Sequence, residues 1–458
     1  MLLGKVFERF AALTPMCVAA RAVMEAALGS GELDALFAKN ARRQYTRTLL
    51  FSTCVELMST VVCRVHRSVH AAHQASLDRI AVSIKSVYSK LEHLEPGLSA
   101  ELVRHTARTL TPVIGRMKGA LPSPLPGYRV RIVDGNHLAA TQRRLKVLRD
   151  VAAGALPGQT LVVLDPQLGL ACDVVCCEDG HAQERSLLEP ILRQAAPRDL
   201  WIADRNFCTT AALMELIQRG ACFLIRQHAS TLRWTRQSRL RRAGRCETGT
   251  LRERTLWLED AHGQTQPVRQ ITLTLDRPTR DGETKIRLLT NLPVRAAAPP
   301  RVAELYRRRW TIEGLFQGLT TILRCEVDTL AYPKAALFGF CVALAASNVY
   351  ATVKASLRAA HGAEHVERNV SDHYLGAEIA GKYEGMMIAI PEKHWRPFAD
   401  CGPRKLATLL KSLAARAELR RFQKHPRGPK KPKPRRTRFA DAKHIATARL
   451  LATEKRVE

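Results

Sequence analysis

Residues 128–138, "YRVRIVDGNHL", decide the fold of this chain. After the helical patterning of the preceding residues, this segment predicts a strand that runs to Asp134. The Pro- and Gly-rich run 121–128, "LPSPLPGY", precedes it and is typical of a linker. Before the linker, residues 1–120 show helical periodicity with basic and polar positions spread among the apolar ones. We therefore expect an all-helical N-terminal domain; DNA binding would suit its basic positions, and helical packing alone explains them equally well.

After the first strand, the sequence predicts an α/β layer with the element order β-β-β-α-β-α-β in residues 128–228. The next elements are two strands, a helix, a strand that ends at Asp204, a helix and a last strand: 160–165, 170–177, 182–195, 199–204, 210–220 and 222–228. Because strand ends in such sheets commonly carry ligand sites, Asp134 and Asp204 are candidate functional residues.

The rest of the chain divides into three regions. Alternating runs separated by Gly, Pro and Asp predict a β-rich insertion at 229–297, and helical periodicity returns at 298–360. Its apolar stretch 335–353 is long enough to cross a membrane, but its Ala content, Ser347 and Asn348 favour a buried helix. The C-terminal region 361–458 contains the polybasic run 420–438, which we interpret as an extended arm that binds DNA without sequence preference.

Composition limits the function classes. The chain has 458 residues, 46% of them hydrophobic, and a formal net charge of +30. This balance excludes a disordered protein and indicates a polyanionic partner, nucleic acid rather than a membrane. The twelve cysteines are scattered without a C-x-x-C pair, which favours a reducing cytosol. Cys172, Cys176 and Cys177 come closest to a cluster, but they fall in a predicted strand and are interpreted as core thiols rather than metal ligands.

The segment 306–319, "YRRRWTIEGLFQGL", places one acid, Glu313, among basic and aromatic residues. On a continuous helix with about 100° per residue, apolar side chains form one stripe and a second stripe could face a cleft. That second stripe consists of Tyr306, Arg309, Glu313, Gln317, Thr320 and Arg324. The simplest alternative is a solvated face with an Arg309–Glu313 pair at i, i+4.

Asp134, Asp204 and Glu313 together predict a metal site. Two strand ends and one helix would supply oxygen ligands of the kind that Mg²⁺ prefers. Two such ions can activate a hydroxyl nucleophile and stabilise the leaving oxygen of a phosphodiester. Neighbouring arginines would then hold the flanking phosphates.

Other residues compete for these roles. Asp165, Asp173 and Asp179 are interpreted as turn or solvent-facing acids, and Glu184 as a first-turn acid or a spare ligand. His137 could line the cleft or be structural, and Arg205 could pair with a site carboxylate or reach a phosphate. The arginine-rich run 226–245, with Trp234 inside it, suits either DNA contact with indole stacking or a solvated loop.

Asp134, "ADRNF" around Asp204 and "YRRRWTIE" resemble the DDE transposases of the insertion-sequence-4 family. Tyr306, Arg309 and Glu313 match its signature Tyr-x2-Arg-x3-Glu-x6-Lys, whereas the Lys position holds Thr320. Arg324, one helical turn further on, could replace that cation, although its planar head makes the replacement imperfect. The resemblance covers roughly residues 128–345.

The resemblance implies a ribonuclease-H-like catalytic domain with a β-rich insertion and a late helix that carries Glu313. It implies cut-and-paste transposition with two Mg²⁺ ions, or Mn²⁺ in their place, bound by Asp134, Asp204 and Glu313. Phosphate contacts would come from Tyr306, Arg309, Arg324 and Arg205. The implied partners are double-stranded DNA, as terminal inverted repeats and target, and a second copy in the synaptic complex, in a prokaryotic cytoplasm and without a membrane. The alternatives are a metal-dependent DNA nuclease, an inactive DNA-binding relic of the same fold, and a glycosidase. A glycosidase would use paired carboxylates, but it would not require a net charge of +30.

Overall fold

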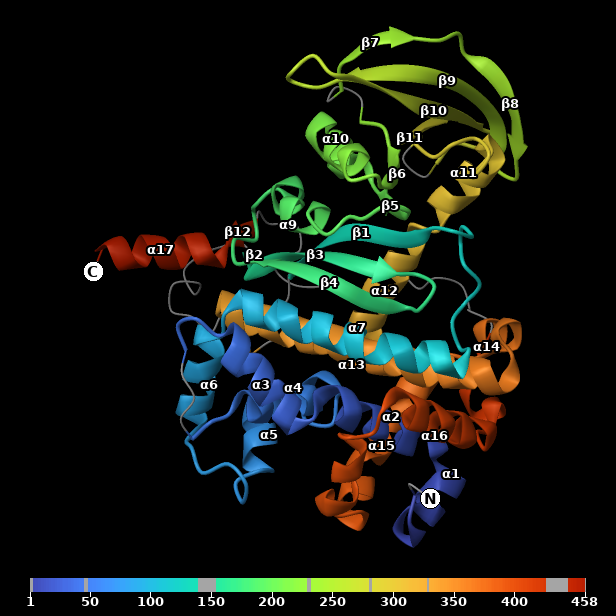
Figure 1. Cartoon of the computed structure of the whole chain (residues 1–458). Coiled ribbons are helices and arrows are strands. Elements are labelled where there is room, and N and C mark those ends of the chain that lie inside the picture. Colours follow the sequence, from blue (N-terminus) through green and yellow to red (C-terminus); the bar gives the residue numbers. More distant parts are fainter. Residues whose placement is uncertain are drawn as a thin grey trace.

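A mixed α/β arrangement is seen in the computed structural model of the chain, which describes residues 3–44, 48–138, 154–228, 232–279, 282–327, 329–425 and 444–457. A central sheet lies across a thick layer of helices, and a strongly curved group of strands extends from its far side (Figure 1). The mixed α/β class with a central sheet agrees with the sequence prediction.

One sheet of ten strands runs through the molecule in the order β4-β3-β1-β5-β6-β11-β10-β9-β7, with β8 paired to β9. The strands of its first half are β1 (Arg129–Leu138), β3 (Gly158–Asp165), β4 (Leu170–Cys177), β5 (Asp199–Ala203) and β6 (Cys222–Arg226). β1 is antiparallel to β3 and parallel to β5, and β5 is parallel to β6. The three-strand meander and the two parallel additions follow the predicted order. The predicted end of the first strand at Asp134 is wrong: β1 continues to Leu138, because residues 135–138 stay paired with β3.

The predicted helix at 182–195 is wrong. The structure has a 3-10 turn, η2 (Glu184–Leu187), and a single helical turn, α9 (Glu189–Leu192). Pro190, which has no N–H to donate, lies in the first turn of α9 and prevents a continuous helix across this segment. The next crossover contains the 3-10 turn η3 (Arg205–Phe207) and a longer helix, α10 (Thr210–Gln218).

The β-rich region does not form a separate sheet. Its strands are β7 (Trp234–Gln237), β8 (Arg241–Cys246), β9 (Gly249–Glu259), β10 (Thr265–Leu275) and β11 (Lys285–Thr290). β11 pairs antiparallel with β6, so these strands continue the sheet that carries Asp134. Trp234 is partly buried against the core rather than presented to solvent, which contradicts the expectation of a free stacking surface.

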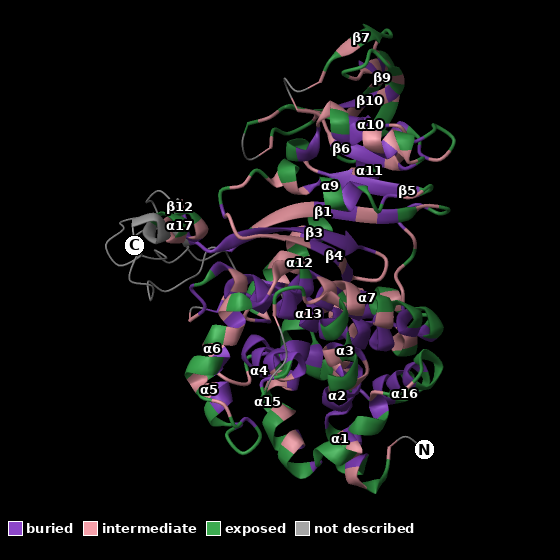
Figure 2. Cartoon of the chain, turned by 60° about the vertical axis from the view of Figure 1, so that its left-hand side comes forward, coloured by how far each residue is buried: buried purple, intermediate pink, exposed green. Residues whose placement is uncertain are grey.

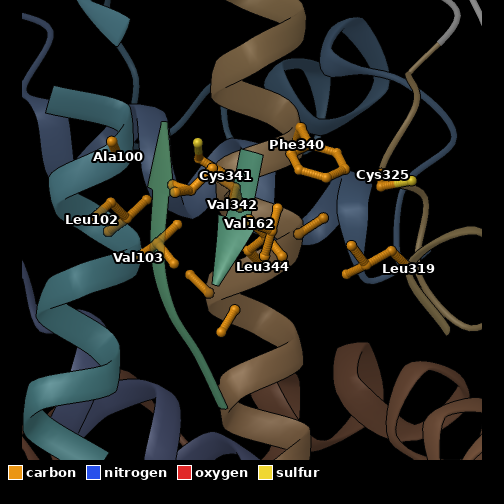
Figure 3. Packing of buried hydrophobic residues seen from close by; sticks show 14 of the residues in the cluster. Ala100, Leu102, Val103, Val162, Leu319, Cys325, Phe340, Cys341, Val342 and Leu344 are labelled. Atoms are coloured by element: carbon orange, nitrogen blue, oxygen red, sulfur yellow. The ribbon is translucent and has the colours of Figure 1, made fainter. Parts of the chain in front are cut away.

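Two long helices, α7 (Pro96–Met117) and α13 (Pro333–His361), lie side by side beneath the sheet (Figure 1). α13 is long and apolar enough to cross a membrane, but 78% of its most apolar window is buried inside the protein. It is a core helix, as the sequence predicted. Side chains from α7, β3 and α13 meet in this core, among them Val103, Val162 and Phe340 (Figure 3).

The remaining helices complete this layer. N-terminal to α7 they are η1 (Lys5–Phe7), α1 (Glu8–Leu13), α2 (Pro15–Leu28), α3 (Ser30–Asn40), α4 (Phe51–Val62), α5 (Val69–Gln74) and α6 (Ile84–His93). C-terminal to α13 they are α14 (Ala363–Asn369), α15 (Asp372–Ala389), η4 (Glu392–His394), η5 (Arg396–Phe398), α16 (Pro403–Ala415) and η6 (Leu419–Phe422). The N- and C-terminal sets share one apolar cluster, with burial highest in the central helices and strands (Figure 2).

Residues 299–324 do not form the continuous helix that the two-stripe interpretation assumed. α11 (Pro299–Arg307) is followed by an i to i+3 turn at Arg308 and Arg309, and then by α12 (Trp310–Thr321). α12 ends there because the guanidinium of Arg64 donates to the carbonyls of Thr320 and Leu323 (2.9 Å each). The helical stripe therefore stops before Arg324.

Near its C-terminus the chain forms a second, two-stranded sheet with β2. β12 (His444–Ala446) pairs in parallel with β2 (Gly154–Leu156), and α17 (Thr447–Val457) follows and extends away from the body (Figure 1). The Arg449 guanidinium binds Asp179 just after β4, with contacts of 2.7–3.1 Å. Most of the polybasic run, residues 426–438, lies outside the described residues, but the chain beyond it is attached rather than free.

Candidate active site

Asp134 and Asp204 come from neighbouring parallel strands. Ile132 of β1 is in register with Ile202 of β5, and each acid lies two residues further along its strand direction. Asp134 accepts a hydrogen bond from the Gly135 N–H (3.0 Å), and Asp204 caps η3 by accepting one from the Asn206 N–H (2.7 Å). The strand pairing thus brings the two predicted acids to the same edge of the sheet.

Glu313 is linked to Asp134 by hydrogen bonds from the side chain of Arg309. The guanidinium donates from Nη1 to Asp134 Oδ2 and from Nη2 to Glu313 Oε1, at 2.9 Å each. Its Nε is buried without a hydrogen-bond partner, and its planar group lies 5.1 Å from the centroid of the Trp310 ring. The 3-10 turn between α11 and α12 thus places a cation between the first and third predicted acids.

The electrostatics of the site are dominated by burial. Burial raises the pKa of Asp134 to about 6, with further upward contributions from the Asp204 and Glu184 carboxylates. Arg309 and the Gly135 N–H lower this pKa, but they do not compensate fully. Burial thus disfavours the charged form of Asp134, and the neighbouring carboxylates add to this effect.

Tyr306 forms the wall of the site beside Arg309. Burial raises the pKa of its phenol to about 12, while the charge of Arg309 and a hydrogen bond with it act in the opposite direction. The hydroxyl therefore stays protonated at neutral pH. Tyr306, Arg309, Glu313 and the two aspartates are the predicted site residues that the structure brings together.

Two predicted DNA-binding arginines have other partners. Arg205 follows Asp204 but lies 3.7 Å from Glu283, which precedes β11 and also pairs with Arg226. Arg324 donates to the Arg67 carbonyl (2.5 Å) instead of lining the α12 face. Thr320 is exposed on α12, and its hydroxyl bonds to the Gln317 carbonyl (3.0 Å). The structure thus separates Arg324 from the helical stripe.

The competing aspartates have structural roles. Asp165 pairs with Arg131 and accepts from two backbone N–H groups of the β3–β4 turn, as the turn interpretation predicted. Asp173 is buried and pairs with Arg104 at 2.5 Å, so the expectation that it faces solvent is wrong. His137 is exposed on β1.

Sequence reasoning underestimated Glu184 and did not consider Asn206 or Glu283. The Asn206 side-chain amide donates to Glu184 Oε2 (3.2 Å), which joins η2 to η3 next to Asp204. The signals in the sequence were Gly135 directly after Asp134 and Asn206 two residues after Asp204. Neither Gly135 nor Asn206 can be assigned a role from the sequence alone, because the sequence does not show that the segment with Glu184 packs against β1.

The residues fit a divalent cation in their chemistry, although no group of three His, Cys, Asp or Glu among the described residues lies close enough to hold one as it stands. The donors are carboxylates, which supply the oxygen ligands that a hard divalent cation prefers. Arg309 already supplies a cation between Asp134 and Glu313. Binding an ion there would require this guanidinium to move.

Comparison with known families adds to this geometry. Residues 125–348 match the transposase DDE domain. The match spans just under half of the chain and contains Asp134, Asp204, Arg309 and Glu313. It supports a DDE transposase, an enzyme that acts on DNA, and DDE domains generally use divalent metal ions. No curated protein matches the chain.

The DDE domain match also explains the placement of the site. It begins just before β1, ends within α13, and therefore covers both aspartate strands, the β-rich strands and α12. Within the matched region the described residues supply two aspartates from adjacent strands and one glutamate from a later helix.

Proposed function

We propose that the chain is a transposase related to the insertion-sequence-4 family, which moves its element by cutting and joining DNA. The observation that carries this proposal is the Arg309 bridge between Asp134 and Glu313, beside Asp204 and inside the region that matches the DDE domain. The ribonuclease-H-like topology of the core is part of the proposal, and the sheet order β4-β3-β1-β5-β6 supports it.

In the proposed site, Asp134, Asp204 and Glu313 hold two Mg²⁺ ions, or Mn²⁺ in their place. When bound, such ions lower the pKa of an attacking water or hydroxyl and neutralise charge on the leaving oxygen. The protein contributes a rigid strand pair for the two aspartates and a helix for the glutamate. Tyr306 is largely buried beside Arg309 and limits access of water on that side.

Arg309 has two successive roles in this proposal. Without metal and DNA it offsets the charge of Asp134 and Glu313, and with them it is released to a DNA phosphate. Tyr306 stays protonated and can donate to the same phosphate. Arg205 and Arg324 are proposed as further phosphate contacts, each after leaving its present partner.

The proposed reaction has two steps. Water attacks the phosphodiester at the element end, the P–O3′ bond breaks, and the 3′ oxygen takes up a proton. The freed 3′-OH then attacks a target phosphodiester and displaces another 3′ oxygen. Two element ends must meet for this, so a dimer of the chain bound to terminal inverted repeats is proposed, in a prokaryotic cytoplasm.

A second candidate is a relic that binds or cuts DNA without joining it. Thr320 favours it, because the signature position holds no cation and Arg324 points elsewhere. The net charge of +30 suits DNA binding in either case.

Cleavage of a labelled duplex that carries the candidate inverted repeats tests the proposal. Wild type with Mg²⁺ should cut at the repeat boundary, whereas wild type with EDTA and the Glu313→Gln variant should not. Joining of the freed end to a second DNA distinguishes a transposase from a nuclease. Tight binding of the duplex by the wild type without any cleavage would instead support the inactive DNA-binding relic.

A further inference from the structure

Glu184 approaches the site from the opposite side of the sheet to Glu313. Val133 of β1 packs in the apolar cluster that includes Leu188, next to η2, whereas its neighbour Ile132 packs in the cluster that includes Ile312 of α12. Glu313 and Glu184 therefore belong to segments on different faces of β1. Asp134 and Asp204 lie on the strands between them.

Gly135 makes the approach of Glu184 possible. A Cβ atom at this position would lie 2.0 Å from Glu184 Oε1 and 2.4 Å from its Cδ. The Glu184 carboxylate thus occupies the space that any other residue would fill with its own side chain. Glycine weakens a strand interior, and its presence there is typical of a close approach by another group.

Asn206 ties Glu184 to the second aspartate. Its side-chain amide donates to Glu184 Oε2 (3.2 Å), and its backbone N–H donates to Asp204 Oδ1 (2.7 Å). One residue thus fixes both carboxylates relative to each other. Each carboxylate keeps an oxygen that these two bonds do not use.

The two carboxylates tied by Asn206 have no direct ion pair among the described residues, although the charge of Asp204 acts on Arg309. Arg309 pairs with Asp134 and Glu313, whereas among the described residues neither Asp204 nor Glu184 has an ion pair. The charge of Glu184 also raises the pKa of Asp134. Two fixed carboxylates without a direct ion pair beside a third form an arrangement that a divalent cation would stabilise.

We infer that Glu184 is a fourth carboxylate of the metal-binding set, on the Asp204 side of the site. This inference rests on the proposed function, because it assigns a residue to the same metal site. Glu184 would strengthen the binding of a divalent cation by oxygen ligation, either directly or through a water that the cation keeps.

Mn²⁺ binding to the full-length protein without DNA provides the test, with free Mn²⁺ measured by electron paramagnetic resonance. Glu184→Gln removes the charge but keeps an oxygen that can accept from Asn206. It should weaken Mn²⁺ binding about tenfold, the usual cost of removing a supporting ligand at a metal site. Glu189→Gln is the matched control. Glu189 is exposed five residues further on, its ion pair within the described part of the chain is with Arg193, and its replacement should leave binding unchanged.

Asp204→Asn separates failure of the inference from failure of the proposed function. Weak binding by Asp204→Asn together with wild-type binding by Glu184→Gln would overturn the role of Glu184 and leave the metal site intact. Absence of Mn²⁺ binding by the wild type would count against both. If circular dichroism shows that Glu184→Gln does not fold, Glu184→Asp is used instead. This variant keeps the negative charge but has a shorter side chain. Wild-type affinity of Glu184→Asp for Mn²⁺ would contradict direct or water-mediated binding by Glu184 at its present position.

Discussion

Asp134 and Glu313 share one guanidinium. Arg309 donates to both at 2.9 Å, and its side chain is only 13% exposed. A largely buried charge between two acids is costly to remove, because its partners are left without compensation. The site is thus held together without metal by a residue of the chain itself.

Replacing Arg309 with Met should therefore destabilise the protein in EDTA by about 1–3 kcal/mol, after allowance for partial solvent screening. Mg²⁺ should restore more stability to this variant than to wild type, since a bound cation replaces the lost charge. Urea unfolding with and without Mg²⁺ measures both effects. Arg307→Met is the matched control: it breaks only an exposed pair with Glu247 and should change little.

Replacing Asp204 with Ala should abolish cleavage and leave DNA affinity roughly intact. The side chain caps a 3-10 turn and has no ion pair with a phosphate-binding arginine, so its loss removes a metal ligand rather than a DNA contact. Gel-shift and cleavage assays on the same duplex separate the two properties. Cutting at the wild-type rate would refute the assignment of Asp204.

The titration of Asp134 should appear in the pH dependence of stability. Its folded-state pKa of about 6 lies above the ordinary value of 3.8, so the folded protein binds this proton more tightly than the unfolded chain does. Stability should therefore fall as pH rises from about 4 to about 6, by about 1–3 kcal/mol relative to a variant without this group. Urea unfolding of wild type and Asp134→Asn in EDTA, from pH 4 to 7.5, measures the difference. Parallel curves would show that the pKa of Asp134 is ordinary.

Thr320→Lys should strengthen DNA binding. The position is exposed on α12, about two helical turns beyond Glu313, and the new ammonium can reach a phosphate. The slope of log affinity against log salt should steepen by about one unit for one added phosphate contact. Thr321→Lys, an exposed neighbour about 100° around the helix, is the control for nonspecific charge. Equal gains from both variants would show that the signature position has no special place at the DNA.

Arg449→Gln should loosen the C-terminal helix. Arg449 makes three contacts with Asp179, and β12 is too short to hold α17 strongly by itself. Limited proteolysis should release the C-terminal residues faster in this variant than in wild type. Arg456→Gln leaves the Asp179 contacts intact and should be cleaved from the body at the wild-type rate.

The sequence predicted the two aspartate strands because their signal is local. Apolar runs that lead up to Asp134 and Asp204 reveal the two strands, and the prediction that the acid follows the strand holds for Asp204, directly after β5. It is wrong for Asp134, because β1 continues to Leu138 through its pairing with β3. The i, i+4 pair of Arg309 and Glu313 is local as well. The sequence therefore predicts those features whose residue pattern lies within a single segment.

Prediction failed where a distant segment determines the local structure. Arg64, which is distant in the sequence, donates to the carbonyls of Thr320 and Leu323 at the end of α12. Residues 306–324 contain no signal that predicts this contact. The turn at Arg308 coincides with the bond from Arg309 to Asp134 across to β1. Pro190 is a local signal against the predicted helix at 182–195, but the helical periodicity on both sides of it conceals the break. The approach of Glu184 to Gly135 depends on the stacking of layers, which a single sequence does not encode locally.

The pairing of β12 with β2 has a consequence for shortened versions of this protein. A chain that ends after residue 425 loses the basic run and also the strand that covers β2, including the fully buried Ala446. The uncovered edge would present unpaired backbone N–H and C=O groups, which are templates for association with other chains. Aggregation of such a truncated protein would therefore reflect an exposed strand edge, not the loss of its positive charge.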